Sequence, residues 1–466
     1  MPLRQRHDTI AAIATPVGEG GISVIRVSGE KAISLCNSLF SGGKSLLAAL
    51  SHTIHFGHFI DANGKMIDEV LVSVFRAPHS YTGEDSVEIS CHGGMYLANL
   101  VLSTILRQGV RMADPGEFTL RAFLNGQMDL TQAEAVAALI HAKTEKSHTA
   151  SLAQLSGGLS MHIEALRQSL INLCSLLELE LDFSQEGIGL TKQADVVNHI
   201  DASITDINDL LATYSYGRIL REGMKVVLTG KPNAGKSSLL NILLRQDRAI
   251  VSEIPGTTRD VIEENLSING LLIRLVDTAG IRESTDMIEE EGVRRTHEQL
   301  ESASVIVVLI DTSELISYID KSLYKRLLEI SRRNKSTVIF LLNKSDITHH
   351  DFKFNVNLLG SEFQMFVSCV TESGIYEFKQ KLFEISLPNY DSLSNSIILQ
   401  NERHKVALEK TVESLRLARQ TLTNGLSGDF VAVDLRAALD YLGEIIGITT
   451  PDDILQNIFS KFCIGK

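Results

Sequence analysis

Short apolar runs and helical periodicity alternate through the middle of the chain, from residue 219 to about residue 385. The first run, 226–228, leads into a glycine-rich loop and then into a segment of helical character over 238–244. Further strands are expected at 272–276, 305–310, 338–342 and 366–367. This alternation is typical of a mostly parallel sheet with helices on both faces, whose ligands bind at the carboxyl ends of the strands. The pattern therefore predicts a doubly wound α/β domain.

Two stretches with a 3.6-residue repeat flank this domain, one from 118 to about 215 and one over 397–460. In the first, one helical face is traced by Leu159, Ile163, Leu166, Leu170, Leu173, Leu176, Leu177 and Leu181. In the second, the spacing is kept by Leu435, Leu439, Leu442 and Ile446. We interpret both stripes as core packing. Either the α/β domain is inserted into one helical domain, with its two ends close in space, or the chain has two separate helical domains.

The first part of the chain, residues 8 to 120, has the pattern of an α+β domain. Strands are expected at 9–14, 22–27, 71–75 and 87–90, and a helix at 97–106. The whole pattern predicts a multidomain α/β protein divided at 1–120, 121–217, 218–386 and 387–466.

Composition narrows the possible roles. The 466 residues are 44% hydrophobic and 22% charged, as in an ordinary soluble globular protein. The net charge of -13 argues against a broad basic face for nucleic acid, so contact with RNA would need a local patch or a partner. Five scattered cysteines without a C-x-x-C pair predict reduced thiols, and no signal peptide or membrane-length apolar run is found. We expect a cytoplasmic protein without membrane contact.

The loop after the first strand of the α/β domain has the spacing G-x-x-x-x-G-K-S, formed by Gly230, Gly235, Lys236 and Ser237. Glycines let successive backbone N–H groups turn toward phosphate oxygens, and the following helix adds its positive end. Lys236 would reach the β- and γ-phosphates, and the Ser237 hydroxyl would bind Mg²⁺. A glycine-rich turn that binds nothing is the alternative, but the flanking strand and helix favour phosphate binding.

Two more loops supply candidates for the γ-phosphate and the metal ion. Asp277, at the end of a strand, suits a second-shell or water-mediated role at Mg²⁺, and Gly280 can donate its N–H to the γ-phosphate. The loop before it reads Ile-Pro-Gly-Thr-Thr-Arg-Asp from Ile254. Its Thr257-Thr258 pair is the candidate for completing Mg²⁺ coordination when a triphosphate is bound.

A third group of residues points to guanine. Asp346 follows an apolar strand, and its carboxylate can accept two hydrogen bonds from the guanine edge, whereas adenine presents a donor at the wrong place. Asn343 and Lys344 would brace the loop and cover the base, and the backbone of Ser368-Cys369 can face the guanine O6. Each string alone is a weak signal, but their order on successive strand ends strongly indicates a GTP site.

With these motifs, the middle domain resembles GTPases of the translation-factor-related class, and the chain as a whole resembles the MnmE (TrmE) family of tRNA-modification GTPases, within the TrmE-Era-EngA-like group. The resemblance is carried by DTIAAIATP, GEGGISVIRVSG, YTGEDSVEISCHGG, PGEFTLRAFLNGQMDLTQAEAV, GKPNAGKSSLLN, IPGTTRD, DTAGIRE and the terminal FCIGK. The first and last of these strings are not general GTPase motifs, so the match to this family is specific.

Motifs and resemblance together define the expected GTP contacts. These are Asn233, Ala234, Gly235, Lys236, Ser237, Ser238, Ser252, Glu253, Ile254, Pro255, Gly256, Thr257, Thr258, Asp277, Thr278, Ala279, Gly280, Asn343, Lys344, Asp346, Ser368 and Cys369, with Ser237 and Thr258 on Mg²⁺.

The resemblance also implies how GTP would be cleaved. Ras-like proteins orient the attacking water with a Gln where this chain has Ile281, and no arginine finger can be assigned from the sequence. The family is described as using a K⁺ ion in place of the arginine finger. The residues that hold this ion map to Asn233, Ser252, Ile254 and Thr257. The family's water-orienting Glu maps to Glu289, so Glu289 and Lys236 are the expected catalytic residues. Taken alone, Asn233 reads as a turn residue and Glu289 as a solvated helix charge.

For the N-terminal domain, the resemblance implies a 5-formyl- or methylene-tetrahydrofolate site. Its contacts map to Arg26, Glu88, Gln127 and Lys466, and Gln127 stands where other members can carry Lys. Cys463, in FCIGK, would lie near this site, either as a catalytic cysteine or as a buried structural thiol.

The reaction implied by the resemblance adds a carboxymethylaminomethyl-type group to C5 of the wobble uridine, U34, of certain tRNAs. The partners would be a second copy of this chain, joined through the N-terminal domain, and an FAD-containing MnmG-type protein in a heterotetramer or larger complex. GTP hydrolysis would be stimulated by dimerisation of the GTPase domains. The alternative is a GTP-switch ribosome-assembly factor without modification activity. A membrane-associated GTPase is opposed by the lack of a lipidation or amphipathic basic segment.

Overall fold

The computed structural model describes residues 8–16, 18–182, 193–248, 263–277, 298–354, 363–388, 397–425 and 428–465. By their contacts, the residues form two compact units. The first unit is made of 1–137, 154–204 and 407–466, and the second of 138–153 and 205–406.

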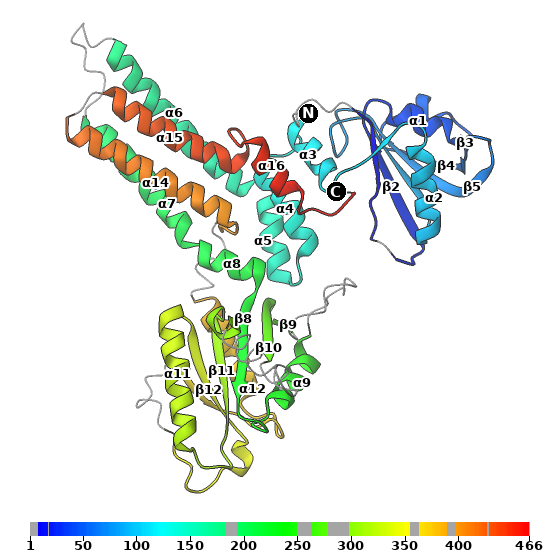
Figure 1. The fold of residues 1–466 in the computed structure, drawn as a ribbon. Coiled ribbons are helices and arrows are strands. Elements are labelled where there is room, and N and C mark those ends of the chain that lie inside the picture. Colours follow the sequence, from blue (N-terminus) through cyan, green and yellow to red (C-terminus); the bar gives the residue numbers. More distant parts are fainter. Residues whose placement is uncertain are drawn as a thin grey trace, which may run out of the picture. The chain divides into compact units, whose positions relative to one another are not determined.

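The first unit begins with a seven-stranded sheet of order β3-β4-β5-β6-β2-β1-β7 (Figure 1). The elements are β1 (Ile10–Ile13), β2 (Ile22–Ser28), α1 (Ala32–Ser38), β3 (Phe40–Gly42), the 3-10 helix η2 (Leu46–Ala48), β4 (Thr53–Ile60), β5 (Met66–Phe75), β6 (Ser86–His92), α2 (Met95–Leu106) and β7 (Arg111–Met112). The expected strands and the helix at 97–106 are confirmed, whereas β3, β4 and β7 were not expected. The described pairs are antiparallel except that of β1 with β7.

The sheet has one face in a core and one partly open face. On β5, Val70, Val72 and Val74 are buried with α1 and α2, while Leu71 points the other way and is 45% exposed. This period-2 alternation is what a half-buried strand requires. The open face also carries Arg26 of β2, whose register partner on β6 is Glu88. The two strands thereby bring two predicted folate contacts side by side.

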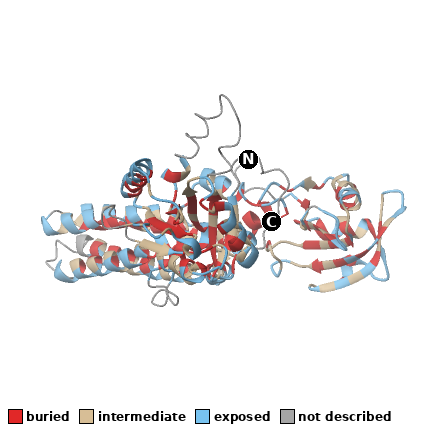
Figure 2. Cartoon of the chain, turned by 90° about the horizontal axis from the view of Figure 1, so that it is seen from below, coloured by how far each residue is buried: buried red, intermediate tan, exposed pale blue. Residues whose placement is uncertain are grey.

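Long helices make up the rest of the first unit, and some of them continue into the second. They are α3 (Glu117–Leu124), α4 (Leu130–His141), α5 (Glu145–Leu155), α6 (Gly158–Asp182), α7 (Gln193–Ala212), α14 (Glu402–Thr423), α15 (Gly428–Ile446) and α16 (Asp452–Phe459). In Figure 2 these helices carry buried and exposed positions in alternation, as amphipathic helices do. Leu176 departs from the predicted core stripe. It is 41% exposed, because at that turn of the helix only Leu173 and Leu177 face the core.

The two helical stretches pack together. Helix α6, from before the α/β domain, lies beside α15, from after it (Figure 1), and Arg436 of α15 pairs with Glu178 of α6. The Arg419 guanidinium in α14 also lies 2.7 Å from the Asp201 carboxylate in α7. The α/β domain is therefore inserted into one helical domain, and the prediction of an insertion is confirmed.

The second unit is built on a six-stranded sheet of order β13-β12-β11-β8-β10-β9. Its elements are α8 (Tyr214–Glu222), β8 (Met224–Gly230), α9 (Lys236–Asp247), β9 (Glu263–Ile268), β10 (Leu271–Asp277), β11 (Val305–Asp311), α11 (Tyr318–Asn334), β12 (Thr337–Asn343), the 3-10 helix η5 (Ser345–Ile347), β13 (Phe363–Phe366) and α12 (Ile375–Ser386). The strands pair in parallel except β9 with β10. The predicted doubly wound sheet is thus confirmed, with β9 added as an antiparallel edge strand.

Both faces of this sheet are covered. In β8, Val226 belongs to the core that also contains α9 and α12 residues, and Val227 belongs to the opposite core under α11. Neighbouring residues of β11 and β12 alternate between the same two cores. Strands buried on both faces need continuous apolar sequences, which is why these runs could be recognised from sequence.

The two ends of the inserted segment meet. The backbone N–H of Leu399 donates to the Thr213 hydroxyl oxygen at 3.0 Å. A Cβ at Gly217 in α8 would lie 2.2 Å from the Leu399 carbonyl oxygen, so only glycine lets the two segments approach this closely. The entry and exit of the domain are therefore joined at one point.

Among the residues that the structure describes, no helix is both long and apolar enough to span a bilayer. All five cysteines are free.

Candidate functional site

The predicted phosphate loop connects β8 to α9, and the helix begins at Lys236, two residues before the expected start at 238. Gly235 caps this helix with a φ of +100°, in the left-handed region. A Cβ there would lie 2.1 Å from Asn343 Nδ2, so both the conformation and the space require glycine. Asn233 also has a positive φ, +63°, and is exposed. The loop thus has the curled backbone that an anion cradle requires.

Lys236 lies within this loop and is only 8% exposed. Its ammonium group donates to the carbonyl oxygens of Gly230 at 3.0 Å and Lys231 at 2.7 Å. A phosphate oxygen carries far more negative charge than a carbonyl, so an entering phosphate would compete well for this ammonium. The neighbouring Ser237 and Ser238 are exposed at the first turn of α9, where the Ser237 hydroxyl is available to a metal ion.

Asn343, the last residue of β12, connects three loops and is only 2% exposed. Its side-chain amide donates to the Ala234 carbonyl at 2.8 Å, and its side-chain oxygen accepts from the Cys369 backbone N–H at 3.1 Å. Its own carbonyl accepts from the Thr312 backbone N–H at 3.0 Å. Asn343 therefore ties the phosphate loop to the Ser368–Cys369 segment expected to contact the base and to the segment that follows β11 at Thr312.

Asp346 and Ser368 lie together on these base-contacting loops. The Ser368 hydroxyl, which is buried, donates to Asp346 Oδ1 at 2.5 Å, while the Asp346 residue itself is exposed. This contact orients the carboxylate and leaves Oδ2 to face a ligand. Next to it, burial raises the pKa of the Cys369 thiol, so this group is neutral at physiological pH.

Lys344 reaches back to β11. It has a left-handed φ of +62°, and its ammonium group pairs with Asp311 at the end of that strand. Burial acts to raise the pKa of Asp311, but the hydrogen bonds from Lys344 and Ser313 outweigh it and hold the pKa below its usual range. The ion pair therefore persists at neutral pH and fixes the start of the guanine loop.

The remaining predicted GTP contacts divide into two groups. Asp277 ends β10 in parallel register with Leu228 of β8, so it lies at the same edge of the sheet as the phosphate loop. Outside the described residues lie Ser252, Glu253, Ile254, Pro255, Gly256, Thr257, Thr258, Thr278, Ala279, Gly280 and Glu289. For these residues the roles stay predictions.

The predicted folate contacts lie in the first unit. The Arg26 guanidinium pairs with Glu88 at 2.8 Å and lies over the Tyr81 ring, 4.9 Å from its centroid. Arg26 Nη1 is buried and has no hydrogen-bond partner in the described part of the chain. A buried guanidinium N–H without an acceptor is unfavourable, and an incoming ligand oxygen would satisfy it.

The other two predicted folate contacts are Gln127 and Lys466. Gln127 is exposed, and its side-chain nitrogen lies 3.1 Å from the position of a Cβ on Gly83, two residues from Tyr81. The C-terminal segment reaches β1, since a Cβ on Gly465 would lie 2.3 Å from the Ile13 carbonyl. Lys466 itself is outside the described residues. Cys463 is exposed, so the interpretation of this residue as a buried thiol is wrong.

Sequence reasoning missed several residues that support these sites. Tyr81 and Phe118 stack on Arg26, and Lys231 pairs with Asp320 of α11. Of these, only Asp320 had a local signal, because Ser317 and Asp320 have the spacing of a helix capping box. The other contacts join segments that are distant in sequence.

A phosphate loop and a loop predicted to read guanine, joined by Asn343 at the strand ends of a doubly wound sheet, are the arrangement of a GTP-binding P-loop domain, here inserted into a helical domain. Residues 130–463 match the MnmE helical domain, and residues 9–127 match the N-terminus of the GTP-binding protein TrmE. The chain belongs to the MnmE (TrmE) family of tRNA modification GTPases.

Relatives named "tRNA modification GTPase MnmE" align over nearly the whole chain. That of Carboxydothermus hydrogenoformans is 46% identical and covers 99% of this chain and 100% of its own. Those of Moorella thermoacetica and Syntrophus aciditrophicus are 46% and 43% identical, and each covers 98% of this chain and 99% of its own.

Proposed function

We propose that this protein hydrolyses GTP in the modification of tRNA. The observation that carries the proposal is the side chain of Asn343, which holds the phosphate loop and the guanine loop in one site. Its relatives are named as GTPases of tRNA modification, and the family match extends through the N-terminal and helical domains. The finer reaction is addition of a carboxymethylaminomethyl-type group at C5 of U34.

The cation requirement is part of the proposal. Mg²⁺ would be held by Ser237 and Thr258, and K⁺ by Asn233 with the backbone of Ser252, Ile254 and Thr257. When bound, K⁺ supplies positive charge where negative charge develops on the phosphates. The exposed Asn233 side chain at the loop rim suits this role. Glu289 would orient the attacking water, since Ile281 cannot.

Hydrolysis should therefore be faster in K⁺ than in Na⁺ at matched ionic strength. We expect Asn233→Ala to reduce the K⁺ stimulation at least tenfold while leaving GDP affinity nearly unchanged. Equal rates of phosphate release in the two salts would contradict the role of K⁺ but not the GTPase assignment.

The second ligand in the proposal is 5-formyl- or methylene-tetrahydrofolate, bound at Arg26 and Glu88 with Gln127 and Lys466. Arg26 Nη1, which is buried and has no partner in the described ranges, and the aromatic ring over which Arg26 lies fit an aromatic ligand with acceptor oxygens. The bound folate would supply a one-carbon unit.

Calorimetric titration of the full chain with 5-formyl-tetrahydrofolate tests this site. Arg26→Met should abolish binding, and Gln127→Lys should strengthen it by adding charge near the ligand's carboxylates; unchanged affinity in both variants would contradict the assignment.

A homodimer through the N-terminal domain is also proposed. On the open sheet face, Ile54, Phe56 and Leu71 are 67%, 64% and 45% exposed, and Phe56 is the register partner of Leu71. Contiguous exposed apolar side chains are typical of interaction surfaces. An FAD-containing MnmG-type partner, in a heterotetramer or larger complex in the cytoplasm, completes the proposed assembly and would share contact with tRNA.

The decisive experiment is mass analysis of wobble uridine in tRNA from cells lacking this protein. Loss of the C5 modification, restored by the wild-type chain but not by a GTP-binding variant, is the expected result. Fully modified tRNA together with a ribosome-assembly defect would favour the alternative, a GTP-switch assembly factor.

A further inference from the structure

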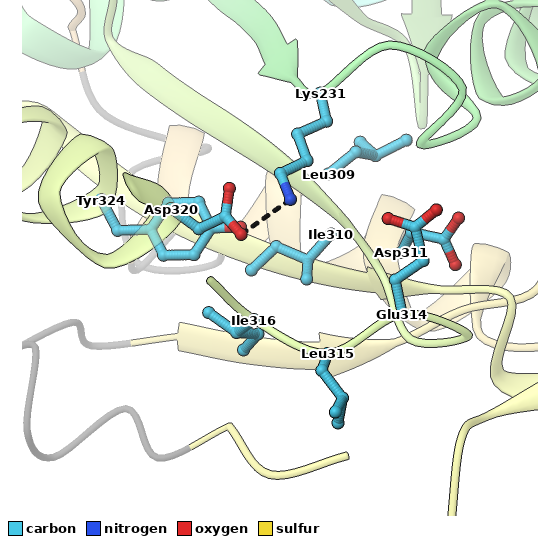
Figure 3. A pocket seen from close by; sticks show the side chains of 9 residues that line it. All are labelled: Lys231, Leu309, Ile310, Asp311, Glu314, Leu315, Ile316, Asp320 and Tyr324. Carbon is cyan, nitrogen blue, oxygen red and sulfur yellow. Dashed lines mark ion pairs between the residues drawn. The ribbon is translucent and has the colours of Figure 1, made fainter. Parts of the chain in front are cut away.

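A small hollow beside the phosphate loop contains an ion pair between a residue of that loop and a residue outside all of the sequence motifs. Figure 3 shows Lys231, from the phosphate loop, pointing across the end of β11 to Asp320 of α11. The Lys231 ammonium lies 2.7 Å from Asp320 Oδ2. The side chain of Asp320 is 4% exposed, whereas that of Lys231 is 42% exposed. A nearly buried carboxylate thus takes its counter-charge from the phosphate loop.

Asp320 is held firmly in place. Its Oδ2 also accepts from the Ser317 backbone N–H and from the Ser317 hydroxyl, both at 2.7 Å. Burial acts to raise the pKa of Asp320, but the hydrogen bonds from Lys231 and Ser317 hold it below the usual range. The carboxylate is therefore ionised and rigid, since the capping box locks it to the first turn of α11.

Lys231 is in turn linked to the catalytic lysine. Its backbone carbonyl accepts from the Lys236 ammonium at 2.7 Å. The same residue is thus anchored at its side chain by Asp320 and supports Lys236 by its backbone. A shift of the Lys231 backbone would move both the phosphate cradle and the resting position of Lys236.

We propose that Asp320 is a positioning residue for GTP turnover, which acts through Lys231 to hold the phosphate loop in the shape that places Lys236. The inference rests on the proposed GTPase function. Helix capping alone does not explain the pair, because Ser317 caps α11 through the Asp320 backbone N–H without Lys231. Misplacing a positioning group by about 1 Å can slow a reaction by about a hundredfold.

The test is a double-mutant cycle with Asp320→Asn and Lys231→Gln in the full-length protein. Asn keeps an oxygen that can accept from Ser317, and Gln removes an exposed charge, so the second variant does not depend on the fold of α11. We expect each single variant to lower kcat/KM for GTP about tenfold, which is about 1.4 kcal/mol. The double variant should be no worse than either single one, since both remove the same contact.

Two controls separate positioning from general stability. Lys231→Arg keeps the charge and should restore kcat/KM to within about twofold of wild type. Arg333→Gln removes the exposed pair with Glu301 at the other end of α11 and should leave kcat/KM unchanged. Additive losses in the double variant, or normal turnover in both single variants, would overturn the inference. Absence of GTP hydrolysis in the wild-type chain would instead overturn the proposed function.

Discussion

At the scale of single residues, the loops of the nucleotide site are tied to one another by side-chain hydrogen bonds. Asn343 joins the phosphate loop to Cys369, and Ser368 orients Asp346. The buried side chains of Asn343 and Ser368 are thus paired with other residues of the site, and these pairs hold the described loops in register with one another. Preformed contacts of this kind lower the ordering that binding must impose.

The base preference should depend on Asp346. Asp346→Asn replaces an acceptor oxygen by a donor, so it should weaken GTP binding about a hundredfold and favour xanthine nucleotides, whose 2-oxo group accepts. Competition between GTP and XTP in equilibrium binding measures this ratio. An unchanged preference for guanine would show that another residue reads the base.

The phosphate affinity should depend on Lys236. Lys236→Ala removes the ammonium group within the loop, and tight binding of triphosphate should be lost, with kcat/KM for hydrolysis reduced by at least a hundredfold. Nucleotide titration and phosphate release provide the two measurements. Turnover close to wild type would contradict the role assigned to this residue.

At the scale of elements, helix α3 is attached to the N-terminal sheet by a buried charge network. Glu117, which is 3% exposed, accepts from Arg111 at 2.5 Å and from Arg121 at 3.0 Å. Arg121 also donates to the Asp8 carbonyl at 2.6 Å. Because α3 also carries Phe118, which lies against Arg26, this network positions one wall of the proposed folate site.

Removing the Glu117 charge should loosen α3. Burial acts to raise the pKa of Glu117, but the hydrogen bonds from Arg111 and the Asp114 backbone, with the nearby charge of Arg121, hold it below its usual range. The carboxylate therefore stabilises the fold above its ordinary pKa, and this contribution is lost as the pH falls through the lowered pKa. At pH 7, Glu117→Gln should destabilise α3 by about 3 kcal/mol, and the difference from wild type should shrink in acid.

Hydrogen exchange in residues 117–124 as a function of urea measures this effect. The control is Glu178→Gln in α6, which breaks a pair with Arg436 that is exposed on both sides and should leave the exchange of residues 117–124 unchanged. Equal exchange in wild type and Glu117→Gln would contradict the structural role of the network.

At the scale of the whole molecule, one domain is inserted into another. Helices from both sides of the insertion pack together in the first unit, and the two ends of the insertion meet at Gly217 and Leu399 in the second. The segments that enter and leave the α/β domain therefore run together at this junction.

Gly217→Ala should weaken this junction. Alanine in a helix is favoured over glycine by about 1 kcal/mol, but a Cβ 2.2 Å from the Leu399 carbonyl must push the two segments apart, at a cost of about 1–3 kcal/mol or more. We expect a net loss and faster hydrogen exchange at 214–222 and 397–401. Ser215→Ala, at an exposed position of the same helix, should be neutral or slightly stabilising. Slower exchange in Gly217→Ala would mean that helix propensity outweighs the clash.

Much of the fold could be predicted because burial leaves a pattern. Strands β8, β11 and β12 lie between two cores and are continuous apolar runs, so they were predicted to within a residue or two. Strands β4 and β9 were missed because their sequences are not continuous apolar runs. Strand β4 exposes one face and contains two histidines, and strand β9 lies at the edge of its sheet and begins with two glutamates. Their strand character depends on pairing with neighbours that are specified elsewhere in the chain.

By itself, the sequence determined the class of chemistry. The phosphate loop and the guanine loop work through residues a few positions apart, and local spacing alone decides whether backbone N–H groups and Asp346 can face a nucleotide. Only the tertiary structure decided that Asn343 joins those loops, that Asp320 holds Lys231 and that Arg26 keeps a buried N–H without a partner among the residues that the structure describes. Such contacts depend on which side chains are buried next to one another in the folded chain. Because these side chains are distant in sequence, no local sequence pattern predicts that they will be in contact.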